Sequence, residues 1–165
     1  MSIGLIIVVI VAVALVVGPV MMMRPNPAQK IKENLRSLAR AHGVHFSMRN
    51  LPKQADEQDQ PAAIPVYFLP PEKSQLSPSW MLVRTNYEHE INLLGWWAWQ
   101  GEPRAIDSEL AVLEAQLQAL PESVKAVSSG SGGICVYWEE KGGEPVLQQI
   151  FRLLESLKAV VSSQN

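Results

Sequence analysis

The chain begins with MSIGLIIVVIVAVALVVGPVMMM, residues 1–23, and this stretch decides how the rest of the molecule is organised. It contains no charged residue, and its centre is an almost unbroken run of Ile, Val, Leu and Ala. A bilayer core of about 30 Å is crossed by about 20 apolar helical residues, each rising roughly 1.5 Å. The stretch therefore predicts a transmembrane helix over 1–23, followed by a polar domain beside the membrane.

A cleaved secretory signal peptide is the main alternative for this stretch. Such a peptide has a basic start, a shorter apolar core and small residues at its cleavage site. Ala12-Val13-Ala14 could provide the small residues, but Met1-Ser2 carries no basic side chain and the apolar run continues past them. The pattern favours an uncleaved anchor.

Basic residues predict which way the anchor points. None precedes the apolar run, and five follow it closely, at Arg24, Lys30, Lys32, Arg36 and Arg40. By the positive-inside tendency we expect a single-pass protein of the bacterial inner membrane, with its N-terminus outside and its C-terminal domain in the cytoplasm. A single cysteine, Cys135, rules out an intramolecular disulfide and agrees with a reducing compartment.

Charge is distributed unevenly along the chain. Residues 24–53 hold seven Lys/Arg and one Asp/Glu, a balance of +6, whereas residues 54–165 hold seven Lys/Arg and fifteen Asp/Glu, a balance of −8. Anionic headgroups attract the basic part, while the acidic remainder is repelled by anionic lipid and by nucleic acid. We therefore expect a lipid bilayer among the partners and no nucleic acid.

Residues 24–43 are expected to form a basic juxtamembrane helix, since Asn26-Pro27 is a typical helix start and Gly43 is placed to end it. Ile31, Leu35 and Leu38 recur at helical spacing and form one apolar stripe. The candidate membrane-surface contacts are the basic residues around this stripe: Arg24, Lys30, Lys32, Arg36 and Arg40. The helix, about 27–42, could equally pack on its own domain.

Residues 44–165 are predicted to form one cytoplasmic α+β domain. Together with the segments above, the chain is expected to have a transmembrane helix, a mainly antiparallel sheet of about six strands, and two or three further helices on one face. Strands are predicted at 44–51, 64–69, 80–87, 91–100, 124–127 and 134–138. Helices are predicted up to 120, with Asp107 as the N-cap, and from Pro145 onward. Residues 52–63 read as a mobile acidic loop, and the prolines around 64–69 indicate a strand at a sheet edge.

The strands at 80–87 and 91–100 are expected to form an antiparallel hairpin with a turn near 88–90. The second strand is apolar on both faces, so it is either central and covered on both sides, or one face awaits a partner. Within it lie Trp96, Trp97 and Trp99, which are candidates for a protein interface because tryptophan is enriched there. Packing in the core is the alternative for all three.

Catalytic, cofactor and metal sites are not indicated. The glycine-rich residues 129–133 precede a strand rather than a helix, so they predict a hairpin and not a phosphate loop. His42, His45 and His89, with Glu88 and Glu90, lack a second cluster that would complete a metal site. No base near Cys135 in the sequence would activate its thiol.

The opening of the chain resembles the YajC-type accessory subunit of the bacterial Sec translocon, through Arg24-Pro25, Gln29-Lys30 and the basic face up to Arg40. That family has one N-terminal span with its N-terminus outside, followed by Arg-Pro and a basic cytoplasmic helix. The resemblance covers about 40 residues. The tryptophan-rich hairpin and the two later helices depart from the family, whose small β domain does not map onto 44–165.

The function expected from the sequence is that of a non-enzymatic adaptor or accessory subunit, which binds a membrane-protein partner through its cytoplasmic domain. The first alternative is a ligand-binding or sensory domain that uses the covered sheet as a pocket, although no small-molecule ligand is evident. A cryptic enzyme ranks last, and would need groups such as Arg84, Glu88 and His89 in one cleft.

Overall fold

The computed structural model describes residues 3–22, 26–53, 62–71, 79–88, 90, 92–102 and 104–163, with backbone alone for 18–22. The chain divides into two compact units, residues 1–33 and 34–165. The first contains α1 (Ile3–Met22) and the start of α2 (Pro27–Ala41). The second contains the rest of α2 and the α+β domain. The helix predicted at about 27–42 is confirmed.

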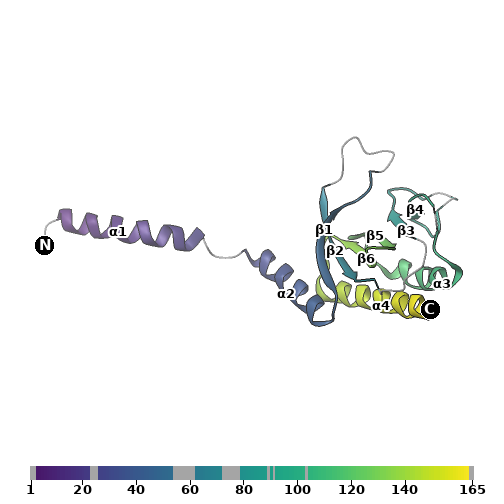
Figure 1. The fold of residues 1–165 in the computed structure, drawn as a ribbon. Helices are drawn as coiled ribbons and strands as arrows, with labels where there is room; N and C mark the ends of the chain where they lie inside the picture. The colour runs from purple at the N-terminus through teal and green to yellow at the C-terminus, as the bar shows by residue number, and fades with distance from the viewer. Residues whose placement is uncertain are drawn as a thin grey trace. The chain divides into compact units, whose positions relative to one another are not determined.

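The domain is built on one six-stranded antiparallel sheet (Figure 1). Its strands are β1 (His45–Asn50), β2 (Ala63–Leu69), β3 (Trp80–Arg84), β4 (Trp97–Trp99), β5 (Val124–Ser129) and β6 (Ile134–Trp138). They lie in the order β1-β2-β6-β5-β3-β4, and every neighbouring pair is antiparallel. The predicted α+β class and six-stranded sheet are confirmed.

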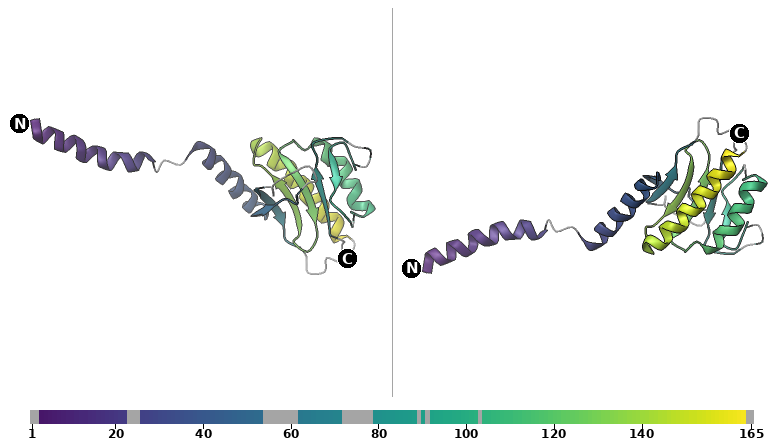
Figure 2. Two further views of the ribbon diagram at one scale, coloured as in Figure 1. Left: turned by 90° about the horizontal axis from the view of Figure 1, so that it is seen from above. Right: turned by 90° about the horizontal axis from the view of Figure 1, so that it is seen from below.

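Helices cover one face of this sheet. α3 (Asp107–Gln116) and the short 3-10 turn η1 (Leu117–Ala119) lie between β4 and β5, and α4 (Gly143–Ser162) follows β6, which is the expected order. In both views of Figure 2, α3 and α4 lie side by side on the same side of the sheet. The predicted arrangement of helices on one face is therefore confirmed.

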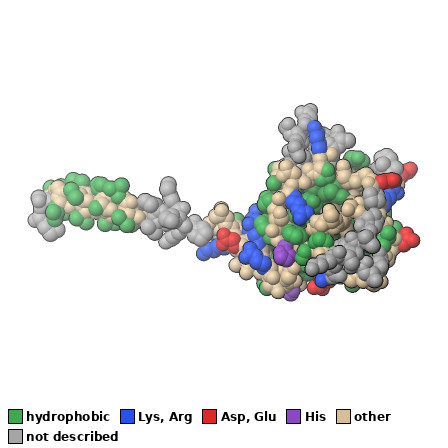
Figure 3. Space-filling model, viewed as in Figure 1, with side chains coloured by type: hydrophobic (Ala, Val, Ile, Leu, Met, Phe, Trp, Pro, Cys, Tyr) green, Lys and Arg blue, Asp and Glu red, His purple; other side chains and the backbone are tan. Residues whose placement is uncertain are grey.

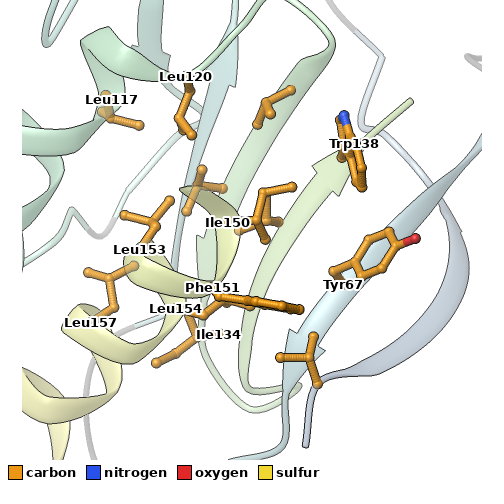
Figure 4. Packing of buried hydrophobic residues seen from close by; sticks show 14 of the residues in the cluster. Tyr67, Leu117, Leu120, Ile134, Trp138, Ile150, Phe151, Leu153, Leu154 and Leu157 are labelled. Atoms are coloured by element: carbon orange, nitrogen blue, oxygen red, sulfur yellow. The ribbon is translucent and has the colours of Figure 1, made fainter. Parts of the chain in front are cut away.

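The main core lies between these helices and the sheet. α4 contributes the whole apolar stripe that its spacing predicts, and each member is buried: Val146, Leu147, Ile150, Leu153, Leu154 and Leu157. Figure 4 shows part of this stripe facing Tyr67, Ile134 and Trp138 of the sheet. From α2, Leu35 and Ala39 are buried in the same cluster. Burial of so many large side chains, at about 1.5–3 kcal/mol each, is what holds α4 on the sheet.

The other face of the sheet carries a smaller buried cluster, formed by Ile64, Val66, Val83, Ala126, Cys135 and Tyr137. The helices α2, α3 and α4 contribute to the first cluster, whereas the residues of this second cluster all come from strands. The sheet is therefore apolar on both faces.

The prediction that 64–69 is an edge strand is wrong. β2 lies between β1 and β6, and β1 is the edge. Proline tends to exclude a strand from a sheet interior because it lacks an N–H donor. Here the pairing of β2 with β6 covers only residues 66–69, so Pro65 lies just beyond it and no hydrogen bond to β6 is lost.

The hairpin of β3 and β4 is confirmed, with Arg84 opposite Trp97 and Leu82 opposite Trp99. The predicted extent of its second strand is wrong, and so is the first alternative for that strand, a central place in the sheet. The second strand is Trp97–Trp99 rather than 91–100, and it forms the edge of the sheet rather than its centre. Residues 85–96 connect the two strands, so the chain does not simply turn at 88–90.

Asp107 is the first residue of α3 and not its cap, since Ile106 is the N-cap residue. The mobile loop predicted at 52–63 falls mostly on residues 54–61, which lie outside the described residues.

The large side chains of α1, from Ile3 to Val17, are exposed and apolar, as Figure 3 shows for the described part of this helix. Across the described ranges, no helix combines the length and the apolar character needed to cross a membrane. The transmembrane helix over 1–23 therefore stays a prediction from the sequence.

Candidate protein-binding surface

The three neighbouring tryptophans occupy three different environments. Trp97 is 3% exposed and belongs to the main core. Trp99 is half-buried on the same face, with its ring centroid 5.9 Å from that of Trp80 at an interplanar angle of 90°. Trp96 precedes the strand and is 42% exposed. The pleat of β4 places Trp97 and Trp99 on the same face, because alternate residues of a strand point to the same face, whereas Trp96 lies outside the strand.

Arg84 packs on Trp97 and is itself held by two backbone carbonyls. The guanidinium of Arg84 lies 5.5 Å from the centroid of the Trp97 ring and donates hydrogen bonds to the carbonyls of Leu120 and Pro121, at 3.2 and 3.1 Å. Arg84 is thus used in binding the end of η1 to the sheet. His89, which the cryptic-enzyme alternative also needs, lies outside the described residues.

A buried carboxylate supports the tryptophan side of the core. Glu109 of α3 accepts a hydrogen bond from the indole N–H of Trp80 at 2.9 Å, and another from the backbone N–H of Ile106 at 3.3 Å. The contact with Ile106 satisfies an N–H at the helix start, as a capping residue does. Glu109 therefore fixes Trp80, on which Trp99 packs. In the sequence, Glu109 could be recognised only as an acidic residue in the first turn of a helix. Nothing there indicates its partner Trp80.

The connection from β3 to β4 is held together at Thr85. Its backbone N–H donates to the carbonyl of Trp96 at 2.7 Å. Its hydroxyl lies 2.6 Å from the carbonyl of Tyr87 and 3.0 Å from that of Trp96, and can donate to either. The backbones of Tyr87 and Trp96, nine positions apart in sequence, thus meet at one side chain.

Asn92 adds a second tie within the same connection. Its side-chain amide donates to the carbonyl of Tyr87 at 3.2 Å and to that of Gly95 at 2.7 Å. Gly95 has φ +53°, a conformation that side chains rarely adopt, and it allows the chain to turn back into Trp96 and β4. The described part of this connection is consequently ordered by its own hydrogen bonds.

Two large aromatic side chains project from this ordered connection. Tyr87 is 52% exposed, and Trp96 is 42% exposed. Glu88, also exposed, lies beside Gly95, since its Oε1 is 3.4 Å from where a Cβ on that glycine would be. We call Tyr87, Glu88 and Trp96 the aromatic–acidic surface. Of the three predicted interface tryptophans, only Trp96 belongs to it.

A second polar cluster connects α2 to the sheet. Arg36 donates from Nε and Nη2 to the two carboxylate oxygens of Glu140, at 2.7 and 2.9 Å, and the Tyr67 hydroxyl donates to Glu140 Oε1 at 2.9 Å. The Glu140 side chain is fully buried. The backbone of this residue has φ 57°, which is unusual for a residue other than glycine. The hydrogen bond to Glu140 raises the pKa of Arg36. Burial, together with the charge of Glu140, raises the pKa of Tyr67.

The candidate membrane-surface residues are therefore not equivalent. Lys30, Lys32 and Arg40 are exposed on α2, whereas the charge of Arg36 is matched by Glu140 within the domain. Arg24 lies outside the described residues. The helix contributes Leu35 and Ala39 to the core, so this part of it packs on its own domain. Contact of its exposed basic residues with a membrane stays a prediction.

The cysteine, one of the histidines and the glycine-rich segment considered in the sequence analysis all have contacts or positions that belong to the fold. Burial raises the pKa of the Cys135 thiol, which is 3.4 Å from Nη1 of Arg49. His42 packs on Phe151, with ring centroids 4.6 Å apart. Among the residues described, no three His, Cys, Asp or Glu side chains gather closely enough to hold a metal ion. Residues 130–133 form the predicted hairpin between β5 and β6.

Comparisons with protein-family models, with curated proteins and with solved structures found no match for this chain.

Proposed function

We propose that this protein is a membrane-anchored adaptor, whose cytoplasmic α+β domain binds a membrane-protein partner through the aromatic–acidic surface. The observation that carries the proposal is Trp96, an exposed indole on a connection that Thr85 and Asn92 hold in place. Exposed aromatic side chains on an ordered backbone bind with little loss of conformational entropy, and tryptophan is the residue most enriched at interface hot spots.

Two features support the proposal of a membrane anchor: the side chains of α1 and the uncharged sequence that follows them. From Ile3 to Val17 the described side chains are apolar and exposed, and the sequence stays uncharged through Met23. Such a helix exposes in water a surface whose burial in lipid would be strongly favourable. The basic residues that follow favour a cytoplasmic domain.

Exposed basic residues on α2 support a position of this helix near anionic headgroups. Lys30, Lys32 and Arg40 would each contribute about 1 kcal/mol near such a surface. Arg36 is left out of this set, because its guanidinium is bound to Glu140. The proposal does not depend on the resemblance to the YajC-type subunit, which covers only the anchor and this helix.

The orientation is tested with reporters fused to the C-terminus of the full-length protein. We expect a cytoplasmic reporter to be active and a reporter that works only outside the cytoplasm to be silent, since the Lys/Arg excess follows the apolar run. The reverse pair of activities would contradict the cytoplasmic placement of the domain.

The docking function is tested by crosslinking the full-length protein in its own membrane and measuring which proteins co-purify in constant ratio. We expect one membrane partner with the unchanged protein, and a loss of about tenfold or more in its ratio for Trp96→Ala, as for an interface hot spot. Glu155→Ala, at an exposed position of α4, is the matched control and should retain the partner. Equal recovery with both variants would rule out docking through Trp96.

A further inference from the structure

The aromatic–acidic surface lies in a segment with a one-sided charge. Residues 85–103 contain three glutamates, at 88, 90 and 102, and neither lysine nor arginine. Glu88, Glu90 and Glu102 are all exposed. The larger part of the domain is acidic too, with a balance of −8 over residues 54–165. A ligand for this surface must therefore complement negative charge as well as two aromatic rings.

Arginine and lysine side chains meet both requirements. A guanidinium or ammonium group is attracted to the face of an indole or phenol ring and also pairs with a carboxylate. The fold itself uses the ring contact three times, since Arg36, Arg49 and Arg84 lie over Phe46, Phe68 and Trp97, at 4.2, 5.0 and 5.5 Å from the ring centroids. Arg36 combines its ring contact with a carboxylate partner, Glu140. Among the described residues, no cation is found over the ring of Trp96.

An anionic bilayer is a poor occupant of this surface. Tryptophan and tyrosine do favour membrane interfaces, but this surface contains Glu88 and lies in a segment, 85–103, that has three glutamates and no lysine or arginine, so anionic headgroups repel it. Basic protein segments, in contrast, are abundant where the domain is proposed to sit, because the short cytoplasmic loops of membrane proteins carry an excess of lysine and arginine.

We propose that the aromatic–acidic surface binds a lysine- or arginine-rich cytoplasmic segment of a neighbouring membrane protein, with a basic side chain stacked on Trp96 and paired with Glu88. This inference rests on the proposed function and specifies its partner. Binding of this kind is steered by charge, so it weakens as the salt concentration rises.

The test places a photoreactive benzoylphenylalanine at position 87 of the full-length protein in its own membrane, and leaves Trp96 and Glu88 unchanged. The crosslinked peptide is identified by mass spectrometry. We expect a segment of another membrane protein that contains lysine or arginine. In the same background, Glu88→Lys should lower the crosslinking yield about tenfold and Glu88→Gln about threefold, because reversal adds repulsion to the loss of attraction.

Glu155→Lys is the matched control, since it makes the same change of charge at an exposed position of α4. Its yield should stay within about twofold of the unchanged protein, as for a charge outside the interface. A fall equal to that of Glu88→Lys would overturn the inference, because net charge alone would then explain the effect.

The remaining outcomes separate the two proposals. A crosslink to a protein segment without lysine or arginine would overturn this inference, and so would a crosslink whose yield does not change with Glu88→Lys. Neither result would contradict the adaptor function. A crosslink only to lipid, or only to residues 24–53 of a second copy of this chain, would also overturn it. A surface that crosslinks to nothing would overturn both proposals.

Discussion

Replacing Glu140 with alanine is expected to lower the free energy of unfolding by about 3 kcal/mol, the largest polar effect that the fold predicts. The variant removes the acceptor of three hydrogen bonds, two from Arg36 and one from Tyr67. The Tyr67 hydroxyl is then left buried, and the guanidinium of Arg36 loses its paired charge. Urea unfolding of the full-length protein in detergent, followed by tryptophan fluorescence, measures the change.

Glu139 provides a matched control one residue earlier. It pairs with Lys141 at 2.7 Å and with Lys125 at 3.7 Å, but these side chains are partly or largely exposed, so Glu139→Ala should cost less than about 1 kcal/mol. Equal costs for the two alanine variants would mean that the cluster of Arg36, Tyr67 and Glu140 does not hold α2 to the sheet.

The backbone at Glu140 adds a second, independent comparison. Its φ of 57° costs a residue with a Cβ about 1–2 kcal/mol, whereas glycine adopts it freely. Glu140→Gly should therefore be about 1 kcal/mol less destabilising than Glu140→Ala. A glycine variant that is clearly the less stable of the two would show that the left-handed backbone is not under strain.

Trp97→Ala is expected to lower the free energy of unfolding by about 3–5 kcal/mol, whereas Trp96→Ala should change it by less than about 0.5 kcal/mol. Trp97 is 3% exposed, packs in the main core and lies under Arg84, so its removal leaves a cavity. Trp96 is 42% exposed and belongs to neither buried cluster. The same unfolding measurement on the two variants gives both values.

These two substitutions are chemically identical and one position apart, so each is the control for the other. A similar loss for both would show that Trp96 is part of the core and would remove it as a docking residue. A small loss for Trp97→Ala would show that β4 is dispensable for the fold, contrary to its place in the main core.

The spacing of apolar residues in the sequence is enough to predict the helix α4, the strand β6 and the faces that they bury. The stripe of α4 from Val146 to Leu157 repeats at helical intervals, and an apolar stripe of this width must be buried against another layer. The alternation of β6 likewise places Ile134 and Val136 in one cluster and Cys135 in the other. Patterns of this kind depend on neighbours in sequence, which is why they can be read directly.

The connection 85–96 could not be predicted in the same way. Its apolar residues continue those of β4 and look like one strand, but Asn92 bonds the carbonyl of Gly95, and Gly95 has φ 53°, so the backbone turns and the strand begins only at Trp97. The course of the backbone depends on the side-chain amide of Asn92, which donates to two carbonyls. The alternation of apolar and polar residues carries no information about such a bond. The exposure of Trp96 and the burial of Trp97 follow from where this connection ends.

Contacts between residues far apart in the sequence could not be predicted either. Arg36 looked like any other basic residue of an amphipathic helix, yet its partner Glu140 is 104 positions away. Trp80 and Glu109 are 29 positions apart, in a strand and a helix that meet only in the folded domain. Pairs like these are decided by topology, so no local pattern could separate Arg36 from Lys30, Lys32 and Arg40.

The most direct test of the account is the ratio of membrane partner to Trp96→Ala protein after purification from the membrane, measured on a sample whose unfolding is also recorded. We predict that the variant unfolds like the unchanged protein and loses the partner about tenfold or more. A stably folded Trp96→Ala protein that retains its partner in full would contradict the proposal that the domain docks through this residue.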